Sequence, residues 1–216
     1  MTGLSLQDLR IALIAAAQTV IDSQDMLTKA DQAIGDGDHG LGMARGFKAF
    51  RDVLEINSYP DVPAMLKAAG QAIMMTSGGA SGVIFGTLFM GAAKPVTGTV
   101  LDGKGLAAAL VSGLEAVRAR GKANVGDKTM VDALAPAAGA ALVASERTSV
   151  FAEVAYSAAA AAEAGLEATK AMVATTGKAK GLGERAIGFI DPGALTLSLF
   201  LRSFACAAAG SGSVAP

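Results

Sequence analysis

Carboxylates and glycines concentrate in one short stretch of this 216-residue chain, from Asp31 to Gly42. It reads Asp-Gln-Ala-Ile-Gly-Asp-Gly-Asp-His-Gly-Leu-Gly, so carboxylates stand at Asp31, Asp36 and Asp38. Anionic groups held this close repel one another unless a counter-charge joins them. Carboxylate oxygens are ligands of hard divalent cations, and Mg²⁺ commonly combines one or two carboxylates with substrate phosphates. The stretch therefore indicates a site for Mg²⁺ and a phosphate ligand, the alternative being a solvated polar loop.

Three familiar motifs are matched only in part. Gly35-x-Gly37-x-x-Gly40 has the dinucleotide spacing, but a helical segment precedes it, and its two carboxylates would repel a bare phosphate. The same stretch fails as an EF-hand because Phe47 stands where the closing Glu is needed. Residues 98–105 resemble a Walker A loop but end in Gly105, which lacks the hydroxyl that holds Mg²⁺.

Other loops could complete a site around the acidic stretch. The only histidine, His39, lies within that stretch, which favours a ligand contact over a place in the core. A Gly/Ser-rich turn that leads into a helix presents free backbone N–H groups to phosphate. Each of the remaining loops also has an ordinary explanation as a connector. Together they supply the anion-binding and basic loops that a nucleotide–magnesium site needs: residues 77–82, 121–130, 177–185 and 191–194.

Composition excludes several classes of protein. A net charge of −1 argues against a nucleic-acid partner, and 52% hydrophobic residues argue against a disordered chain. A single cysteine, Cys206, excludes an intramolecular disulfide framework and a cysteine-cluster zinc site. Residues 68–93 carry no charge and are long enough to span a bilayer, but the Thr/Ser/Gly cluster at 76–82 interrupts them. We expect a cytoplasmic protein without a membrane or nucleic-acid partner.

The abundance of Ala and Leu predicts an all-α fold. Ser5 and Asp8 predict a capping box at the first helix. Short links favour an antiparallel bundle. We expect a single nucleotide-binding helical domain over 1–209 and a disordered tail over 210–216. Gly-rich breaks divide the chain into about eight helices, at about 5–30, 43–56, 61–76, 83–94, 105–120, 128–145, 150–176 and 194–209.

Four ordered blocks give the sequence a resemblance to a known family. It resembles the L subunit (nucleotide-binding subunit) of bacterial dihydroxyacetone kinases, which is also the C-terminal nucleotide domain of single-chain ATP-dependent dihydroxyacetone kinases. The resemblance covers most of the chain. The blocks are Asp31…Ile34-Gly-Asp-Gly-Asp-His-Gly40, Gly78-Gly-Ala-Ser-Gly82…Phe85-Gly-Thr87, Arg120-Gly-Lys-Ala123…Gly126-Asp-Lys-Thr-Met130 and Leu182-Gly-Glu-Arg185…Gly188…Asp191-Pro-Gly-Ala194.

The resemblance implies a barrel of eight antiparallel helices with a nucleotide at one end. It implies two Mg²⁺ on Asp31, Asp36 and Asp38, bridging to the phosphates of ADP or ATP. Where the family often has Arg, this chain has Lys178, which keeps the charge but loses the planar fork. The nucleotide contacts that the resemblance implies are His39, Gly40, Leu41, Gly42, Ala80, Ser81, Gly121, Thr129, Met130, Lys178, Asp191, Pro192 and Gly193.

The same resemblance implies a phosphotransferase that acts on an alcohol group. ATP would phosphorylate a small hydroxyketone held on a separate K subunit, where the substrate-binding residues are expected. ADP would stay bound as a coenzyme, recharged by a phosphotransferase-system protein (M subunit). A homodimer or hetero-oligomer is expected. The alternatives are the L component of a split ATP-dependent tetrulose or erythrulose kinase and a nucleotide-sensing module that docks a transcription regulator. Fatty-acid kinases usually read Asp-Gly-Asp-Thr-Gly, so His39 favours the ketose branch.

Overall fold

The computed structural model describes residues 1–210, and this part of the chain is mainly helical. The predicted all-α fold is confirmed. A two-stranded antiparallel sheet, β1 (Gly3–Ser5) and β2 (Val100–Asp102), was not predicted. The α-helices are α1 (Leu6–Asp22), α2 (Gln24–Ile34), α3 (His39–Ile56), α4 (Val62–Thr76), α5 (Gly79–Ala92), α6 (Gly103–Gly121), α7 (Val131–Arg147), α8 (Phe151–Ala168) and α9 (Pro192–Gly210). Two 3₁₀ segments, η1 (Thr169–Ala171) and η2 (Lys178–Ala186), lie between α8 and α9.

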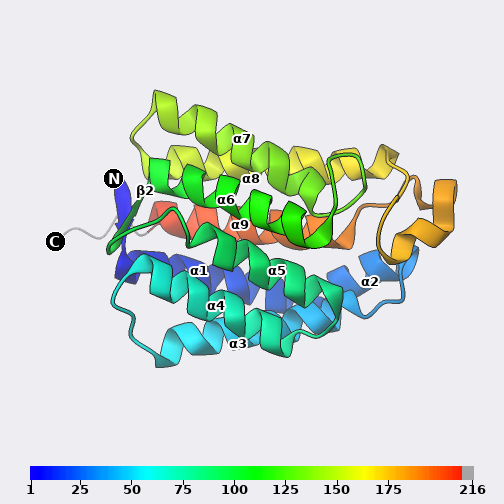
Figure 1. The fold of residues 1–216 in the computed structure, drawn as a ribbon, viewed down its shortest axis with the longest axis horizontal. Helices are drawn as coiled ribbons and strands as arrows, with labels where there is room; N and C mark the ends of the chain where they lie inside the picture. The colour runs from blue at the N-terminus through cyan, green and yellow to red at the C-terminus, as the bar shows by residue number, and fades with distance from the viewer. Residues whose placement is uncertain (211–216) are drawn as a thin grey trace.

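Eight of these helices pack in a closed ring, and Figure 1 shows them side by side along the long direction of the molecule. Along the ring, α1 packs against α3, each helix from α3 to α8 packs against the next, and α9 returns to α1. Neighbouring helices run in opposite directions, so the predicted antiparallel barrel is confirmed. The helix α2 stands outside the ring at one end, against α3, α9 and η2. Both described chain ends lie at the other end of the barrel, beside the small sheet.

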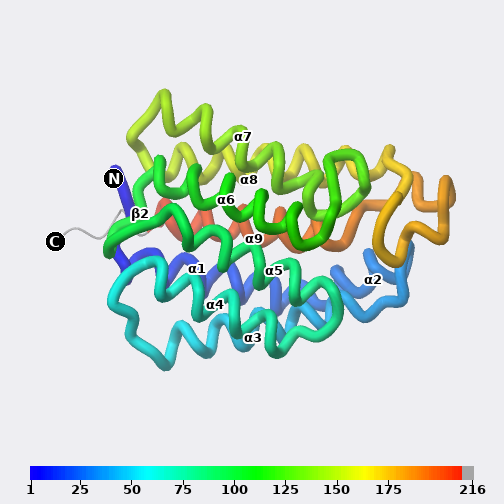
Figure 2. Tube along the Cα trace, in the orientation of Figure 1, coloured from blue at the N-terminus to red at the C-terminus, as the bar shows by residue number. Residues whose placement is uncertain are grey.

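Because the directions of neighbouring helices alternate, helix ends of the same kind lie together at each end of the barrel. The N-termini of α3, α5, α7 and α9 all lie at the end of the barrel that carries α2. Each helix N-terminus has unpaired backbone N–H groups and about half a positive charge. The Cα trace in Figure 2 shows the segment between α8 and α9 folded over this same end, close to α2. The barrel therefore presents several anion-binding helix ends beneath a covering segment.

Several helix boundaries differ from the predicted ones. The segment predicted as one helix over 5–30 is two, because the chain turns at Ser23, whose N–H and hydroxyl bond back to α1 carbonyls. The predicted helix over 150–176 ends at Ala168. α5 begins before the predicted residue 83, since glycines there allow close packing: a Cβ on Gly82 would lie 2.5 Å from Ser77 Cβ. Gly210, placed in the predicted tail, ends α9, and the rest of that tail lies outside the described residues.

The inside of the barrel is filled by apolar side chains from all sides. Phe47 and Phe50 of α3, Phe89 of α5 and Phe200 of α9 form an aromatic centre with ring centroids 4.8–6.4 Å apart.

The predicted cap is confirmed at the start of α1, where the Ser5 hydroxyl accepts the backbone N–H of Asp8 at 3.2 Å.

The uncharged stretch 68–93 is broken between α4 and α5, as predicted from its Ser and Gly residues. Among the described residues, α9 is the one helix long and apolar enough to cross a membrane. Of its most apolar window, 56% is buried within the barrel. A core helix meets the same criteria of length and composition, and α9 packs between α8 and α1 in the ring.

Candidate functional site

A cavity of about 620 Å³ opens at the barrel end where the four helix N-termini meet. Its wall includes the first residue of each of those helices: His39 of α3, Gly79 of α5, Val131 of α7 and Pro192 of α9. Backbone N–H groups at helix starts attract phosphate. Another part of the wall is apolar and includes Ile84, Phe85 and Val117. The cavity therefore combines an anion-binding side with a surface that suits a flat apolar group.

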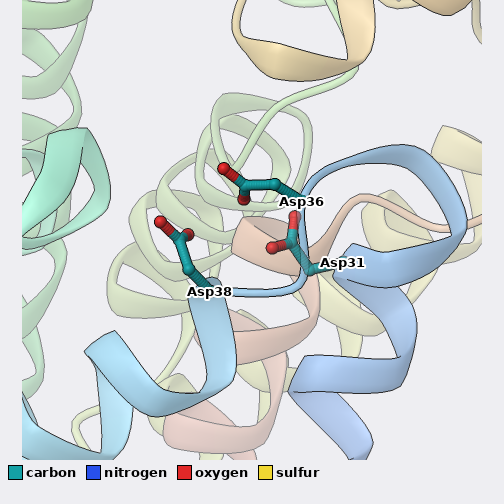
Figure 3. Close-up of side chains that lie close together, drawn as sticks. All are labelled: Asp31, Asp36 and Asp38. Atoms are coloured by element: carbon teal, nitrogen blue, oxygen red, sulfur yellow. The ribbon is translucent and has the colours of Figure 1, made fainter.

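The three carboxylates of the acidic stretch converge beside this cavity. Asp31 comes from the last turn of α2, Asp36 from the loop that follows, and Asp38 from the residue before α3 (Figure 3). One oxygen from each lies within 4.8 Å of the others. Asp31 is buried, 6% exposed, whereas the other two face solvent. Three hard oxygen donors at this separation fit a divalent cation such as Mg²⁺.

Glycines let the loop bring the carboxylates together. A Cβ on Gly35 would lie 2.2 Å from Asp31 Oδ1, so only glycine fits beside that carboxylate. Gly37 has φ +81°, a left-handed conformation that favours glycine. The backbone N–H of His39 donates to Asp31 Oδ2 at 3.1 Å and joins the start of α3 to the end of α2. The fold of this loop thus follows from its local sequence.

Lys178 joins the acidic cluster from a distant part of the chain. Its Nζ lies 2.5 and 2.6 Å from the two carboxylate oxygens of Asp36 and 2.9 Å from Asp38 Oδ2. This ion pair lowers the pKa of Asp36 and raises the pKa of Lys178. The ammonium group shows that the space between these two carboxylates accepts a cation, which supports the fit to a metal ion. Lys178, which stands where the family often has Arg, therefore lies within the site.

His39 connects three helices through both ring nitrogens. The Thr196 hydroxyl donates its proton to the carbonyl of Pro192 at 3.0 Å. Its oxygen can therefore only accept from His39 Nε2, which lies 2.8 Å away, so Nε2 is assigned as the protonated ring nitrogen. Nδ1 is then an acceptor for the Ser81 hydroxyl at 3.1 Å. Burial lowers the pKa of His39, in agreement with a neutral ring. The imidazole thus orients Ser81, at the start of α5, toward the cavity wall.

Asp191 forms the turn that leads into α9. Its Oδ2 accepts the N–H of Ala194 at 2.7 Å, and its own N–H donates to Thr169 Oγ1 at 3.0 Å. Burial is the main cause that raises its pKa, to about 7; the nearby Asp132 carboxylate acts in the same direction, while the Ala194 N–H and Lys128 act in the opposite one. This half-buried carboxyl group therefore titrates near neutral pH.

The cavity brings together residues that lie far apart in the sequence. Among the predicted nucleotide contacts, all except Gly40 line it, together with Asp31 and Asp38. Gly40 instead faces α2, where a Cβ would lie 2.2 Å from Thr28 Oγ1. Asp36 belongs to the carboxylate cluster without lining the cavity. The contacts of these residues with a nucleotide stay a prediction, although their shared location is a property of the fold.

Three cationic side chains on the cavity wall were not among the predicted site residues: Arg45, Arg120 and Lys128. Arg45 donates to the carbonyl of Ser77 at 2.8 Å and so supports the turn before α5. Its position seven residues after Asp38, about two helical turns, places both on the same side of α3 and could have identified it. Lys128 is buried, and a lysine in a loop gives no sequence signal of burial.

The chain is similar to known proteins over most of its length. The chain is 36% identical over 186 residues to the "PEP-dependent dihydroxyacetone kinase 1, ADP-binding subunit DhaL" of Listeria innocua, covering 86% of this chain and 88% of that protein. It is 37% identical over 185 residues to the corresponding subunit of Escherichia coli, covering 85% and 88%.

A solved structure shows the same fold. The dihydroxyacetone kinase from C. freundii, in complex with AMP-PNP and Mg²⁺, superposes with a TM-score of 0.70 at 26% identity. The match covers 90% of this chain, which spans about a third of that enzyme, 33% of its length. Residues 33–206, from the end of α2 into α9, match the DAK2 domain. The chain therefore belongs to the DAK2 domain family.

Proposed function

We propose that this chain is the nucleotide-binding subunit of a dihydroxyacetone kinase, which carries ADP or ATP with Mg²⁺ in the cavity at the end of the barrel. The observation that carries the proposal is the cluster of Asp31, Asp36 and Asp38 at the edge of a cavity lined by four helix N-termini. The ADP-binding subunits of PEP-dependent kinases, at 36–37% identity, support it.

The two sides of the cavity suit the two parts of a nucleotide. Phosphate oxygens would lie at the start of α5, near Ala80 and Ser81, because the first backbone N–H groups of a helix have no partner within it. The base and ribose would lie against Gly121, Met130 and the turn at 191–193. Phosphoryl transfer needs little covalent chemistry from the protein beyond positioning and charge neutralisation. The cavity wall would supply the positioning and, with a bound metal ion, the charge neutralisation.

The carboxylate cluster would hold the metal. We propose two Mg²⁺ on Asp31, Asp36 and Asp38, which when bound would neutralise charge on the phosphates. Asp31 is the residue whose position is most firmly held, because it is buried and accepts the N–H of His39. Lys178 contributes a positive charge at the same place and would contact a phosphate once a metal ion takes its place between the carboxylates.

The acceptor would be held by another subunit. His39, the only imidazole, has both ring nitrogens engaged by Ser81 and Thr196 and is not free to hold a ketone. We therefore propose that a separate K subunit presents a small hydroxyketone at the open end of the barrel, in a cytoplasmic hetero-oligomer. ADP would remain bound between turnovers and be recharged by a phosphotransferase-system protein.

Calorimetric titration of ADP with and without Mg²⁺ tests the metal site. Asp36→Asn removes one carboxylate and should weaken Mg²⁺-dependent ADP binding by about tenfold or more, as for loss of a metal ligand or its support. Asp25→Asn, which removes the same charge from an exposed position of α2, serves as the matched control. If Asp36→Asn binds ADP as the wild type does, the assignment of the metal site is wrong.

Native mass spectrometry of the purified protein tests the donor. Stoichiometric ADP and Mg²⁺, recharged only by the phosphotransferase chain with phosphoenolpyruvate, would support the coenzyme mechanism. Exchange with free ATP would instead identify the L component of a split ATP-dependent ketose kinase. A protein that binds nucleotide but supports no phosphorylation with any K subunit would point to a regulatory module. If neither ADP nor ATP binds, the kinase proposal fails.

A further inference from the structure

A 21-residue segment, 169–189, leaves the ring after α8 and returns to it just before α9. We call it the strap. It folds over the cavity end of the barrel beside α2 (Figures 1 and 2). Residues 176–179, in its middle, line the cavity, and Lys178 reaches the acidic cluster. The strap thus carries one wall of the site on a part of the chain that contains only 3₁₀ turns.

Both ends of the strap meet at one buried ammonium group. Lys128, 2% exposed, donates from Nζ to the carbonyl of Thr169 at 2.5 Å and to the carbonyl of Phe189 at 2.6 Å. Beside it, the N–H of Gly188 donates to the carbonyl of Lys170 at 2.8 Å. A charged donor makes stronger hydrogen bonds than a neutral one. A single side chain outside the strap therefore holds the point where the strap begins and ends.

This arrangement has a cost. Lys128 has φ +60°, which is unfavourable for a residue with a Cβ, and burial lowers the pKa of its ammonium group. The Asp191 and Asp132 carboxylates nearby oppose that effect. Strained conformations and buried charges persist where the surrounding structure supports them, and they concentrate at functional sites. Lys128 is such a residue, on the wall of the cavity.

The rest of the loop that carries Lys128 reinforces the attachment. Asp127, its neighbour, accepts the Thr175 hydroxyl from the middle of the strap, and its carbonyl accepts the Thr175 N–H at 3.3 Å. Asp132 holds the loop itself by accepting the N–H groups of Gly126 and Thr129 at 2.5 and 2.8 Å. This loop, itself held by Asp132, thus contacts the strap both in its middle and at its two ends.

The contacts of the strap with α2 and the acidic cluster are weaker than its hydrogen bonds to Lys128. There, Ala174 and Ala186 pack with Ile34 of α2 in a small apolar cluster apart from the main core. The ion pairs of Lys178 with Asp36 and Asp38 join exposed groups, and such pairs contribute little stability in water. The strap therefore depends on its attachment to the loop that carries Lys128 to hold Lys178 beside the carboxylates.

We propose that Lys128 is a positioning residue, which holds strap 169–189 across the cavity and thereby places Lys178 at the phosphate end of the site. The part of this proposal that concerns ligand release rests on the proposed function, whereas the attachment of the strap does not. Lys128 acts through the backbone carbonyls of Thr169 and Phe189. Without its ammonium group, the strap would open more often and a bound nucleotide would leave faster.

Hydrogen exchange on the full-length, nucleotide-free chain tests the attachment. Lys128→Met keeps the length of the side chain but has no donor, and it should speed amide exchange across 170–188 by about tenfold while the ring helices keep their protection. Lys128→Arg retains a cationic donor and should preserve most of the protection. Lys180→Met, which removes an exposed lysine from the strap itself, is the matched control and should exchange like the wild type.

Release of ADP in the presence of Mg²⁺, followed by stopped flow with a fluorescent analogue, tests the positioning role. Lys128→Met should release the analogue about tenfold faster, in line with the loosened strap. Unchanged exchange of 170–188 in folded Lys128→Met would overturn the attachment, and a loosened strap with unchanged release would overturn the positioning role.

Two further results are decisive. If Lys128→Met does not fold, the wild-type chain and Lys128→Arg still decide the attachment, because strap amides that exchange without protection in the wild type contradict it. If the wild type binds no ADP with Mg²⁺, the proposed function fails. The attachment of the strap at Lys128 is then still tested by hydrogen exchange on the nucleotide-free chain.

Discussion

Replacing Asp191 by Asn should change how the stability of the protein depends on pH. In the folded chain the pKa of this carboxyl group is raised to about 7, from an ordinary value of 3.8, chiefly by burial. Between these two values the folded state binds a proton that the unfolded state does not. Stability therefore falls as pH rises through this window. Asn removes the titration but keeps an oxygen that can accept the Ala194 N–H, so the start of α9 should be preserved.

The magnitude follows from the two pKa values. One pKa unit corresponds to about 1.4 kcal/mol, and integration from pH 5 to pH 8 gives a loss of about 2.5 kcal/mol in the free energy of unfolding. The loss occurs mainly between pH 5 and 7, because above pH 7 both states are ionised. Burial also lowers the pKa of His39, but this residue is present in both proteins, so its effect cancels in the comparison.

Urea unfolding of the wild type and Asp191→Asn at several pH values, without nucleotide and with a chelator, measures the difference. The free energy of unfolding of the variant relative to the wild type should rise by about 2.5 kcal/mol from pH 5 to pH 8. Parallel pH profiles for the two proteins would refute the reasoning, since they would show that Asp191 ionises in the folded protein as it does in the unfolded chain.

Two further substitutions test packing and the site. Gly165→Ala would place a Cβ 2.2 Å from the Asp132 carbonyl oxygen and should destabilise the protein by about 1–3 kcal/mol in urea unfolding. The control is Gly139→Ala, at an exposed position with open space around the new Cβ, which should stabilise the protein by about 0.5–1 kcal/mol. Equal effects of the two substitutions would contradict the close approach of α7 and α8. Thr196→Val leaves buried His39 Nε2 without its acceptor and should cost about 1–3 kcal/mol. Nitrogen NMR of the wild-type imidazole should show protonated Nε2, and a protonated Nδ1 would contradict the assignment.

Local patterns in the sequence determined much of this protein. The acidic stretch needs no distant contact to be recognised, because its glycines and its three carboxylates lie within a few residues of one another. The cap at Ser5 and the break at 77–78 follow from the hydrogen bonding of short polar side chains and from the conformational freedom of glycine. Short links between helices predicted antiparallel neighbours, and the ring of eight helices confirms that prediction.

Only the tertiary structure decided which distant residues meet. Lys178 reaches Asp38 across 140 positions of sequence, and His39 reaches Thr196 across 157. Spacing along a helix or a loop does not encode such pairs, because they depend on how the ring closes between α9 and α1 and on how the strap folds over its end. Burial of Lys128 is likewise invisible in the sequence, since its partners are backbone carbonyls, which every residue carries. Thus the ligand chemistry of the site is local in origin, and its assembly is a consequence of the barrel.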